Sequence, residues 1–227
     1  MSKLILYLKK FIFSTKCSMC NCFLDDDEEY LCLECLSYLE EEGKIKKIEN
    51  CYYSYFYNAK IKNFIENYKL KNQKKLGAIL SKILKLEIEK IIQIEGIDSV
   101  IPVPISDERL RERGFNQVQE VLEKAGINYK KIERIKNTKQ MYKLGGRERR
   151  RENIKKGFRI GVNDFNGKNL LIVDDIITTG STVEEIIEEI HNSCNPKKII
   201  VYTFSLAVKN VERNRDVAGS LYRQRKI

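Results

Sequence analysis

Apolar residues recur at helical spacing in three parts of the chain. Residues 59–95 show the 3.6-residue period of amphipathic helices, interrupted near Asn72 and Gln73, which predicts two consecutive helices. The same spacing begins near Gly114 and again at Val183, and it predicts one further helix in each place.

Shorter apolar segments predict strands. Residues 170–173 are uninterrupted apolar residues, as in a parallel strand that is covered on both faces. Residues 98–104 are typical of a short buried strand that ends in Pro-Val-Pro, and a basic loop separates it from the next predicted helix. Ligands of open α/β sheets bind at such places. Residues 51–57, CYYSYFY, are rich in aromatic side chains and favour a strand that packs in a sheet. A row of aromatic rings that stacks on nucleobases stays open as the alternative.

Charge adds a second signal to this pattern. The 227 residues carry 42 Lys and Arg against 32 Asp and Glu, a net charge of +10. Residues 106–159 hold 17 of the basic residues against 8 acidic ones, so nearly the whole excess lies there. Two clusters, Arg109 to Arg113 and Arg147 to Arg159, favour anion binding over a merely solvated face. The anion is a diphosphate, a nucleic-acid backbone, or both.

Several classes of protein are excluded. No stretch approaches the roughly 18 apolar residues of a transmembrane helix. The apolar run of residues 4–8 is too short for a signal peptide. Residues 4–12 instead predict an amphipathic helix packed on the body, with a membrane-surface helix as the alternative. A single histidine, His191, excludes sites that need two. We therefore expect a cytoplasmic protein without stable membrane insertion.

Five of the seven cysteines stand within nineteen residues. Cys17 with Cys20, and Cys32 with Cys35, form two Cys-x-x-Cys pairs, and two such pairs make the closed tetrahedral site typical of structural zinc. Cys22 is a spare thiol that competes with Cys20 as a ligand. Disulfides, an iron–sulfur cluster and unpaired cysteines are the alternatives. Because a closed site has no open position for water, we expect it to support folding and not catalysis.

Residues 169–183, NLLIVDDIITTGSTV, combine a strand, two acids, a hydroxyl-rich turn and the start of a helix. Gly180 lets the backbone approach a ligand closely, and residues 178–182 offer hydroxyl and N–H groups at a helix N-terminus, where a phosphate is favoured. Asp174 and Asp175 suit ribose hydroxyls and a nearby Mg²⁺. Because neighbouring strand residues point to opposite faces, the chain must leave strand geometry if both acids bind one ligand.

Here the sequence resembles a known family. LLIVDDIITTGST resembles the 5-phosphoribosyl-1-diphosphate (PRPP) motif of type I phosphoribosyltransferases. Three further blocks are similar to the ComF family of competence-associated, phosphoribosyltransferase-like proteins: the cysteine pairs, VIPVPISDERLRERGFNQ and RIKNTKQMYKLGGRERRRENIKKGF. Many members of that family carry a further Cys-x-x-Cys, where this chain has only Cys51, so we expect one zinc ion.

The resemblance implies an α/β fold of the type I phosphoribosyltransferase kind, with a central mostly parallel sheet flanked by helices and a small N-terminal Cys₄ zinc-binding module. It implies an N-terminal helix and zinc module in residues 1–48, a phosphoribosyltransferase-like domain in 49–208 and a basic tail in 209–227. By the same analogy, the loop holds the 5-phosphate, the acids hold the ribose hydroxyls as the catalytic pair, and the Pro-Val-Pro turn lies beside the diphosphate. The implied PRPP-binding residues are Asp174, Asp175, Thr178, Thr179, Gly180, Ser181, Thr182, Val103 and Pro104. The implied residues for diphosphate or nucleic acid are Arg109, Arg113, Arg147 and Arg151.

Two functions stay open. The first is an enzyme that binds PRPP with Mg²⁺ and transfers the phosphoribosyl group to a nitrogen acceptor, in a protein linked by the resemblance to DNA uptake in natural competence. The second is a non-catalytic, PRPP-responsive protein that binds single-stranded DNA together with other competence proteins. The intact acids and loop disfavour a third function, a zinc-bearing binding module whose PRPP site is vestigial. The sequence indicates neither the acceptor nor the oligomeric state.

Overall fold

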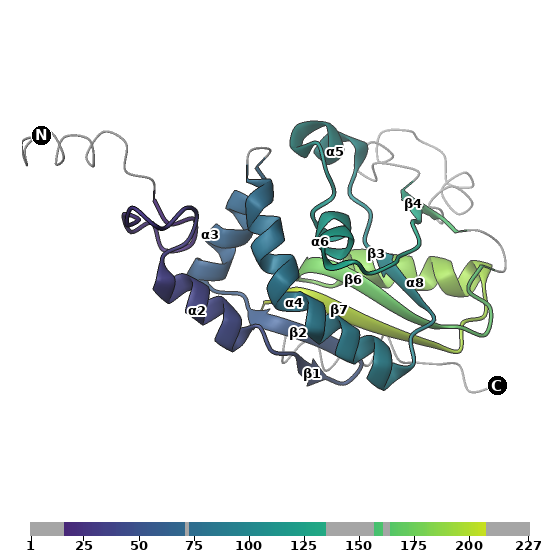
Figure 1. Ribbon diagram of the computed structural model, residues 1–227. Helices are drawn as coiled ribbons and strands as arrows, with labels where there is room; N and C mark the ends of the chain where they lie inside the picture. Colours follow the sequence, from purple (N-terminus) through teal and green to yellow (C-terminus); the bar gives the residue numbers. More distant parts are fainter. Residues whose placement is uncertain (1–15, 71–72, 135–156, 161–163, 208–227) are drawn as a thin grey trace, which may run out of the picture.

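A five-stranded sheet forms the centre of the computed structural model, in the order β1-β2-β7-β6-β3 (Figure 1). The first pair is antiparallel and the other three are parallel, which confirms the mostly parallel sheet implied by the resemblance. The strands are β1 (Lys46–Ile48), β2 (Cys51–Phe56), β3 (Ser99–Pro102), β6 (Asn169–Ile177) and β7 (Lys198–Leu206). A separate antiparallel pair joins β4 (Glu133–Arg134) and β5 (Phe158–Arg159). The structure describes residues 16–70, 73–134, 157–160 and 164–207.

Helices cover both faces of the sheet. α4 and α6 lie on one face and α8 lies on the other, while α5 connects β3 to α6 (Figure 1). The helices are α2 (Leu33–Glu42), α3 (Ala59–Tyr68), α4 (Lys74–Glu95), α5 (Asp107–Arg113), α6 (Gln117–Ala125) and α8 (Ser181–Ser193).

The core consists of two apolar clusters, one on each side of the sheet. Successive strand residues alternate between them: Leu171 and Val173 of β6 pack with α4 and α6, and Leu170 and Ile172 pack with α8. The apolar residues that recur at helical spacing in the sequence form the part of each cluster that comes from the helices. Buried members include Leu76, Leu80, Leu84, Val118, Val121, Ile186 and Ile190.

The segment between β3 and α6 differs from the sequence-based expectation. The sequence predicts a basic loop there, but residues 107–113 form α5. Ser106 caps this helix by accepting from the N–H of Arg109, and Gly114 ends it in the left-handed conformation. The helix thus carries the basic residues on a defined surface beside the end of β3.

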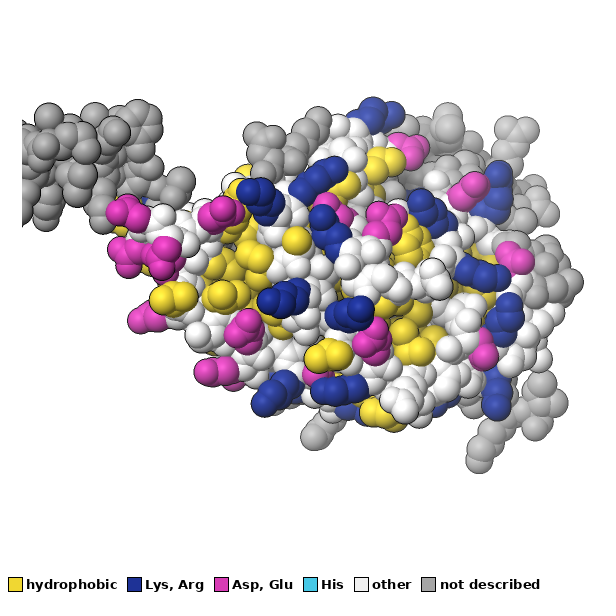
Figure 2. Space-filling model, in the orientation of Figure 1, with side chains coloured by type: hydrophobic (Ala, Val, Ile, Leu, Met, Phe, Trp, Pro, Cys, Tyr) yellow, Lys and Arg dark blue, Asp and Glu magenta, His cyan; other side chains and the backbone are white. Residues whose placement is uncertain are grey.

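The cysteine-bearing segment packs directly against the sheet domain. Cys17, Met19 and Leu39 belong to the same apolar cluster as α3 and α4. Exposed acidic residues 25–27 follow the cysteine pair, and acidic side chains gather at this end of the molecule (Figure 2). The predicted division at residues 48 and 49 stays a prediction.

The expected N-terminal helix of residues 4–12 lies outside the described residues. Within the part of the chain that the structure describes, no helix is long and apolar enough to cross a membrane.

Candidate functional site

The candidate site lies where β3 and β6 separate. The ladder between them ends with the N–H of Val103 donating to Val173 O at 2.8 Å. A continued parallel ladder would pair Val103 O with the N–H of Asp175. Instead, Asn116 Nδ2 donates to Val103 O at 3.0 Å, and the N–H of Asp175 donates to Asp174 Oδ1 at 2.8 Å. The sheet therefore opens beside the two acids, at the carboxyl ends of its parallel strands.

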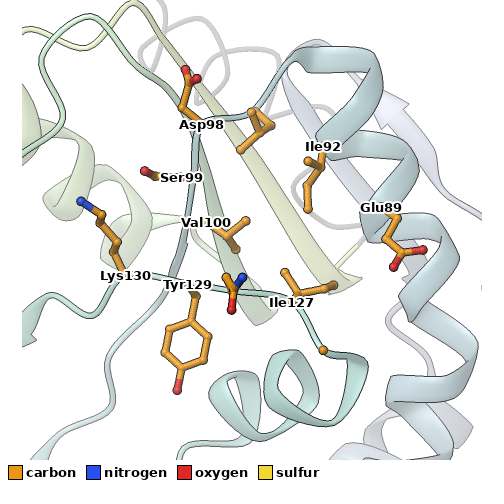
Figure 3. Close-up of a pocket in the computed structure, with 11 residues that line it drawn as sticks. Glu89, Ile92, Asp98, Ser99, Val100, Ile127, Tyr129 and Lys130 are labelled. Atoms are coloured by element: carbon orange, nitrogen blue, oxygen red, sulfur yellow. The ribbon is translucent and has the colours of Figure 1, made fainter.

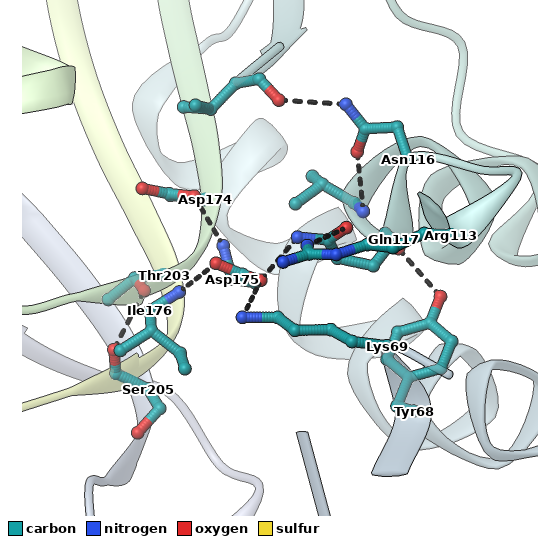
Figure 4. Close-up of polar contacts among 12 residues, drawn as sticks. Tyr68, Lys69, Arg113, Asn116, Gln117, Asp174, Asp175, Ile176, Thr203 and Ser205 are labelled. Atoms are coloured by element: carbon teal, nitrogen blue, oxygen red, sulfur yellow. Dashed lines mark hydrogen bonds and ion pairs between the residues drawn. The ribbon is translucent and has the colours of Figure 1, made fainter. Parts of the chain in front are cut away.

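The two acids have different surroundings (Figure 4). Asp175 Oδ1 accepts from the N–H of Ile176 at 2.7 Å, and Asp175 Oδ2 accepts from Gln117 Nε2 at 2.6 Å. Lys69 Nζ lies 2.8 Å from the same Oδ2. The figure shows Asp175 turned toward Gln117 and Lys69, and Asp174 turned away from them. Both acids stay within β6, which runs on to Ile177.

The alternation of β6 changes phase at these acids. Ile176 packs on the side of α4 and α6, and Ile177 on the side of α8, the reverse of what regular alternation from Val173 would give. The sequence predicts a departure from strand geometry if both acids bind one ligand. The structure agrees with one part of this prediction and not with the other. The strand is irregular at the acid pair, yet the free protein directs the two carboxyl groups differently.

Burial and charge separate the pKa values of the two acids. Burial raises the pKa of Asp174 to about 8, and the neighbouring charge of Asp175 adds to this increase. Burial also acts to raise the pKa of Asp175, but Lys69 and the hydrogen bond from Gln117 outweigh it and lower that pKa overall. The surroundings therefore favour the ionised form of Asp175 and disfavour that of Asp174.

Basic side chains border the acids. Arg113 Nη1 donates to Gln117 Oε1 at 3.2 Å, so the Gln117 amide bridges Arg113 and Asp175. Burial lowers the pKa of Arg113, and the nearby charge of Arg109 lowers it further. Arg109 itself is exposed. A bound anion would relieve the repulsion between the two guanidinium groups.

The predicted phosphate loop joins β6 to α8 as expected. Gly180 adopts the left-handed conformation with a φ of 80° and occupies the N-cap position of α8. Thr179 Oγ1 and Ser181 Oγ lie 3.0 Å apart, and both side chains are exposed. Thr178 is exposed and Thr182 is half-buried. The loop thus presents hydroxyl groups and the N-terminus of a 13-residue helix to solvent.

The structure brings most of the predicted residues to one edge of the sheet. Val103 and Pro104 are buried in the turn that leaves β3. Arg147 and Arg151 lie outside the described residues. Sequence reasoning did not assign Lys69 to the site, because it is one of several lysines near the break between two predicted helices. Gln117 belongs to the sequence block that resembles the ComF family, and the resemblance implies no role for it.

The cysteine cluster is a candidate metal centre. One ligand atom each from Cys17, Cys20, Cys22 and Cys32 lies within 4.8 Å of all the others. Cys35, expected as the fourth ligand, is buried beside them, and burial together with the thiols of Cys32 and Cys20 raises its pKa. The spare thiol, Cys22, thus lies inside the cluster, and Cys35 lies next to it.

The geometry of these thiols fits a tetrahedral metal ion. Cys20 Sγ and Cys32 Sγ are 3.7 Å apart. Zinc–sulfur bonds of about 2.3 Å place tetrahedral sulfur ligands about 3.8 Å apart, whereas a disulfide needs about 2.05 Å. A hydrogen bond from the backbone of Cys22 lowers the pKa of Cys20, which favours the thiolate that binds metal. None of the cysteines in the described chain forms a disulfide. The spacing of these thiols therefore allows the cluster to hold a metal ion such as zinc.

A cavity of about 490 Å³ lies elsewhere, near the amino end of β3 (Figure 3). Apolar side chains such as Ile92, Val100 and Ile127 line it, together with Asp98 and Lys130. None of the predicted site residues lines this cavity. The candidate site at the opposite end of β3 is thus separate from it.

Comparison with known proteins agrees with this geometry. The phosphoribosyl transferase domain family matches residues 120–219, which include the acids and the phosphate loop. Adenine phosphoribosyltransferase, in a crystal structure, aligns with 80% of this chain and 94% of its own at 18% identity, with a TM-score of 0.42. The fold assignment rests on the domain match and the sheet topology.

Two curated relatives carry names from DNA uptake and use. Competence protein F of Haemophilus influenzae is 31% identical over 134 residues, 54% of this chain and 58% of that protein. DNA utilization protein YhgH of Escherichia coli O157:H7 is 33% identical over 131 residues, 54% and 57% respectively. The chain thus spans somewhat more than half the length of these relatives. Together with the domain match and the cysteine cluster, this similarity agrees with the resemblance to the ComF family of competence proteins.

Proposed function

We propose that the protein binds PRPP together with Mg²⁺ at the carboxyl edge of the sheet and transfers its phosphoribosyl group to a nitrogen acceptor. The observation that carries the proposal is the juxtaposition of three groups. Gly180 in the left-handed conformation shapes a hydroxyl-rich loop at the start of α8, Asp174 and Asp175 precede it, and Arg113 lies beyond them. A phosphate ester, a ribose and a diphosphate need groups of these three kinds.

Each part of the site has a chemical task. The loop binds the 5-phosphate through its N–H and hydroxyl groups, and the acid pair orients the ribose hydroxyls. Magnesium, when bound, would neutralise charge on the departing diphosphate, and the carboxylate oxygens are donors of the kind it prefers. Arg113 and Arg109 stabilise the same charge as the bond to C1 breaks and the acceptor nitrogen attacks. No side chain is needed as a general base when the leaving group is this good.

Calorimetric titration of PRPP with MgCl₂ into the zinc-loaded protein tests the proposal. We expect saturable binding that the Asp174→Asn/Asp175→Asn variant loses. Release of diphosphate in the presence of nitrogen-base acceptors then tests catalysis. Absence of binding to the native protein would refute PRPP recognition.

The second candidate function is PRPP-responsive binding of single-stranded DNA. The names of the relatives support it, as do the net charge of +10 of the chain and the exposed position of Arg109. The buried tyrosines 52, 53 and 55 of β2 do not, because packing in the core removes them as stacking surfaces. Phosphate contacts release counterions, so we expect affinity for single strands to fall steeply with salt. Affinity that is equal at low and high salt would refute this function. Both functions place the protein in the cytoplasm, where thiols stay reduced.

A further inference from the structure

The cavity near the amino end of β3 has an apolar lining on the side of α4 and α6. Ile92 of α4, Val100 of β3 and Ile127 after α6 line it, and all three pack in the apolar cluster of that side. Its volume of about 490 Å³ lies within the range of small-molecule sites, roughly 300–1,000 Å³. The cavity is therefore large enough for a small organic molecule.

Backbone hydrogen bonds hold the walls of this cavity in place. Gly126 ends α6 in the left-handed conformation, and the N–H of Ile127 donates to Leu122 O at 2.9 Å. Four residues after Gly126, the N–H of Lys130 donates to Val100 O at 2.8 Å, which ties this segment to β3. The cavity thus has a defined shape before any ligand binds.

The charged groups of the lining lie on different sides of β3. Figure 3 shows Glu89 on the same side of β3 as Ile92 and Ile127, and Lys130 on the opposite side. Lys130 is the basic residue among the described residues of the lining, and its Nζ lies 5.9 Å from the centroid of the Phe165 ring in the other apolar cluster. The apolar side of the cavity therefore carries a carboxylate that Lys130 does not neutralise.

Glu89 retains the capacity to bind a cation. Lys85 Nζ lies 3.9 Å from Glu89 Oε1, and the two side chains are 49% and 47% exposed respectively. The lysine precedes the acid on the helix, which is the less favourable order for such a pair. Exposed ion pairs contribute little, and a carboxylate has about four acceptor positions, so a ligand can compete with Lys85 or bind beside it.

We propose that this cavity binds a small organic cation, a protonated amine on an apolar body, with the body against Ile92, Val100 and Ile127 and the ammonium group beside Glu89. Burial of the apolar body and a charge-assisted hydrogen bond both favour such a ligand. An anion of the same shape is repelled by Glu89 and by Asp98, the second acid of the lining. The site is separate from the candidate PRPP site at the opposite end of β3, and its occupation does not depend on the proposed function.

Two probes that share an indole ring and differ in charge test the site. Tryptamine carries an ammonium group and indole-3-acetate a carboxylate, and NMR titration of the ¹⁵N-labelled full chain measures both affinities and locates the shifted amides. We expect tryptamine to bind with a Kd on the order of 1 mM and to shift the amides of Val100 and Ile127. Indole-3-acetate should bind at least about fivefold more weakly. Absence of shifts at about 10 mM tryptamine, shifts confined to other parts of the chain, or equal affinity for the two probes would overturn the proposal.

Substitutions at two exposed positions of α4 test the role of Glu89. Glu89→Lys should reverse the preference, so that indole-3-acetate binds more tightly than tryptamine. Lys85→Gln is the matched control, because it removes a charge of similar exposure that competes for Glu89, and it should bind tryptamine at least as tightly as the native protein. Ile92→Phe, which fills the cavity, should weaken the binding of both probes. A native preference in Glu89→Lys, or native tryptamine affinity in folded Ile92→Phe, would contradict the site.

Discussion

Gly180 shows how one residue type fixes the geometry of the phosphate loop. Its φ of 80° lies in the left-handed region, where a side chain with a Cβ costs about 1–2 kcal/mol. We expect Gly180→Ala to lower the free energy of unfolding by about 1 kcal/mol and to weaken PRPP binding at least about tenfold, because the loop relaxes and its N–H groups turn from the phosphate. Urea unfolding and calorimetric titration measure the two effects separately.

Gly126 provides the matched control. It has a φ of 74° after α6, and a Cβ added there would meet no atom within 4 Å. Gly126→Ala should therefore lose similar stability through the same backbone strain and keep its affinity for PRPP. If Gly180→Ala binds PRPP as the native protein does, the loop is not the phosphate site.

At the scale of elements, Asn116 connects a helix cap to the opening of the sheet. Its Oδ1 accepts from the N–H groups of Val118 and Gln119, and its Nδ2 donates to Val103 O. We expect Asn116→Ala to lower the free energy of unfolding by about 1–2 kcal/mol and to weaken PRPP binding as well, since the turn after β3 is no longer held. Asn58→Ala, which removes the cap of α3 and an exposed hydrogen bond to Tyr38 Oη, should lose stability alone. Equal PRPP affinities in the two variants would contradict a role of Asn116 in the site.

The sequence predicts the helices and strands more completely than the contacts between side chains that are distant in sequence. The stripes of α3, α4, α6 and α8, the apolar run of β6 and the loop at Gly180 follow from local spacing and residue type, and the structure agrees. The cap signals of α5, Ser106 and Gly114, were also present, but its short, charged sequence lacks an apolar stripe. The contact between Lys69 and Asp175 joins residues 106 positions apart, so no local pattern could indicate it. The cysteine spacing predicts the cluster with Cys35 as the fourth ligand and Cys22 as a competitor of Cys20. In the structure Cys22 joins Cys17, Cys20 and Cys32 instead, because the fold of the turn decides which thiols meet.

At the scale of the whole molecule, Glu95 ties the long helix α4 to three strands of the sheet. Its carboxylate pairs with Lys47 of β1 and Lys198 of β7, and accepts from Tyr52 Oη of β2. Burial would raise the pKa of Glu95, but the two lysines and the tyrosine lower it to about 2. A carboxyl group whose pKa is lower in the folded protein stabilises it above the unfolded pKa, near 4.3.

The stabilisation that the ionised Glu95 carboxylate gives the folded protein should disappear in acid. We expect Glu95→Gln to lower the free energy of unfolding by about 2 kcal/mol at pH 7, because a charge-assisted network is lost. The difference from the native protein should shrink as pH falls from about 4.5 toward 2, where the native carboxylate takes up its proton. Urea unfolding of both proteins across this range measures it. A difference that stays constant with pH would show that the carboxylate charge is not the cause.

The cysteine cluster bears on the stability of the whole chain because its apolar neighbours belong to the core of the sheet domain. Cys17 and Cys32 share one apolar cluster with Leu171 at the centre of β6. We expect about one zinc ion per chain, and its removal by a chelator should cost at least about 3 kcal/mol and destabilise the sheet domain as well as the cysteine segment. Cys17→Ser/Cys20→Ser, which removes one Cys-x-x-Cys pair and leaves too few thiols, should lose the metal, and Cys51→Ser in β2 should retain it. Zinc content after Cys22→Ser and Cys35→Ser would assign the fourth ligand, since only one of the two thiols completes the tetrahedron. Reduced native protein without metal, or full zinc content in Cys17→Ser/Cys20→Ser, would contradict the site.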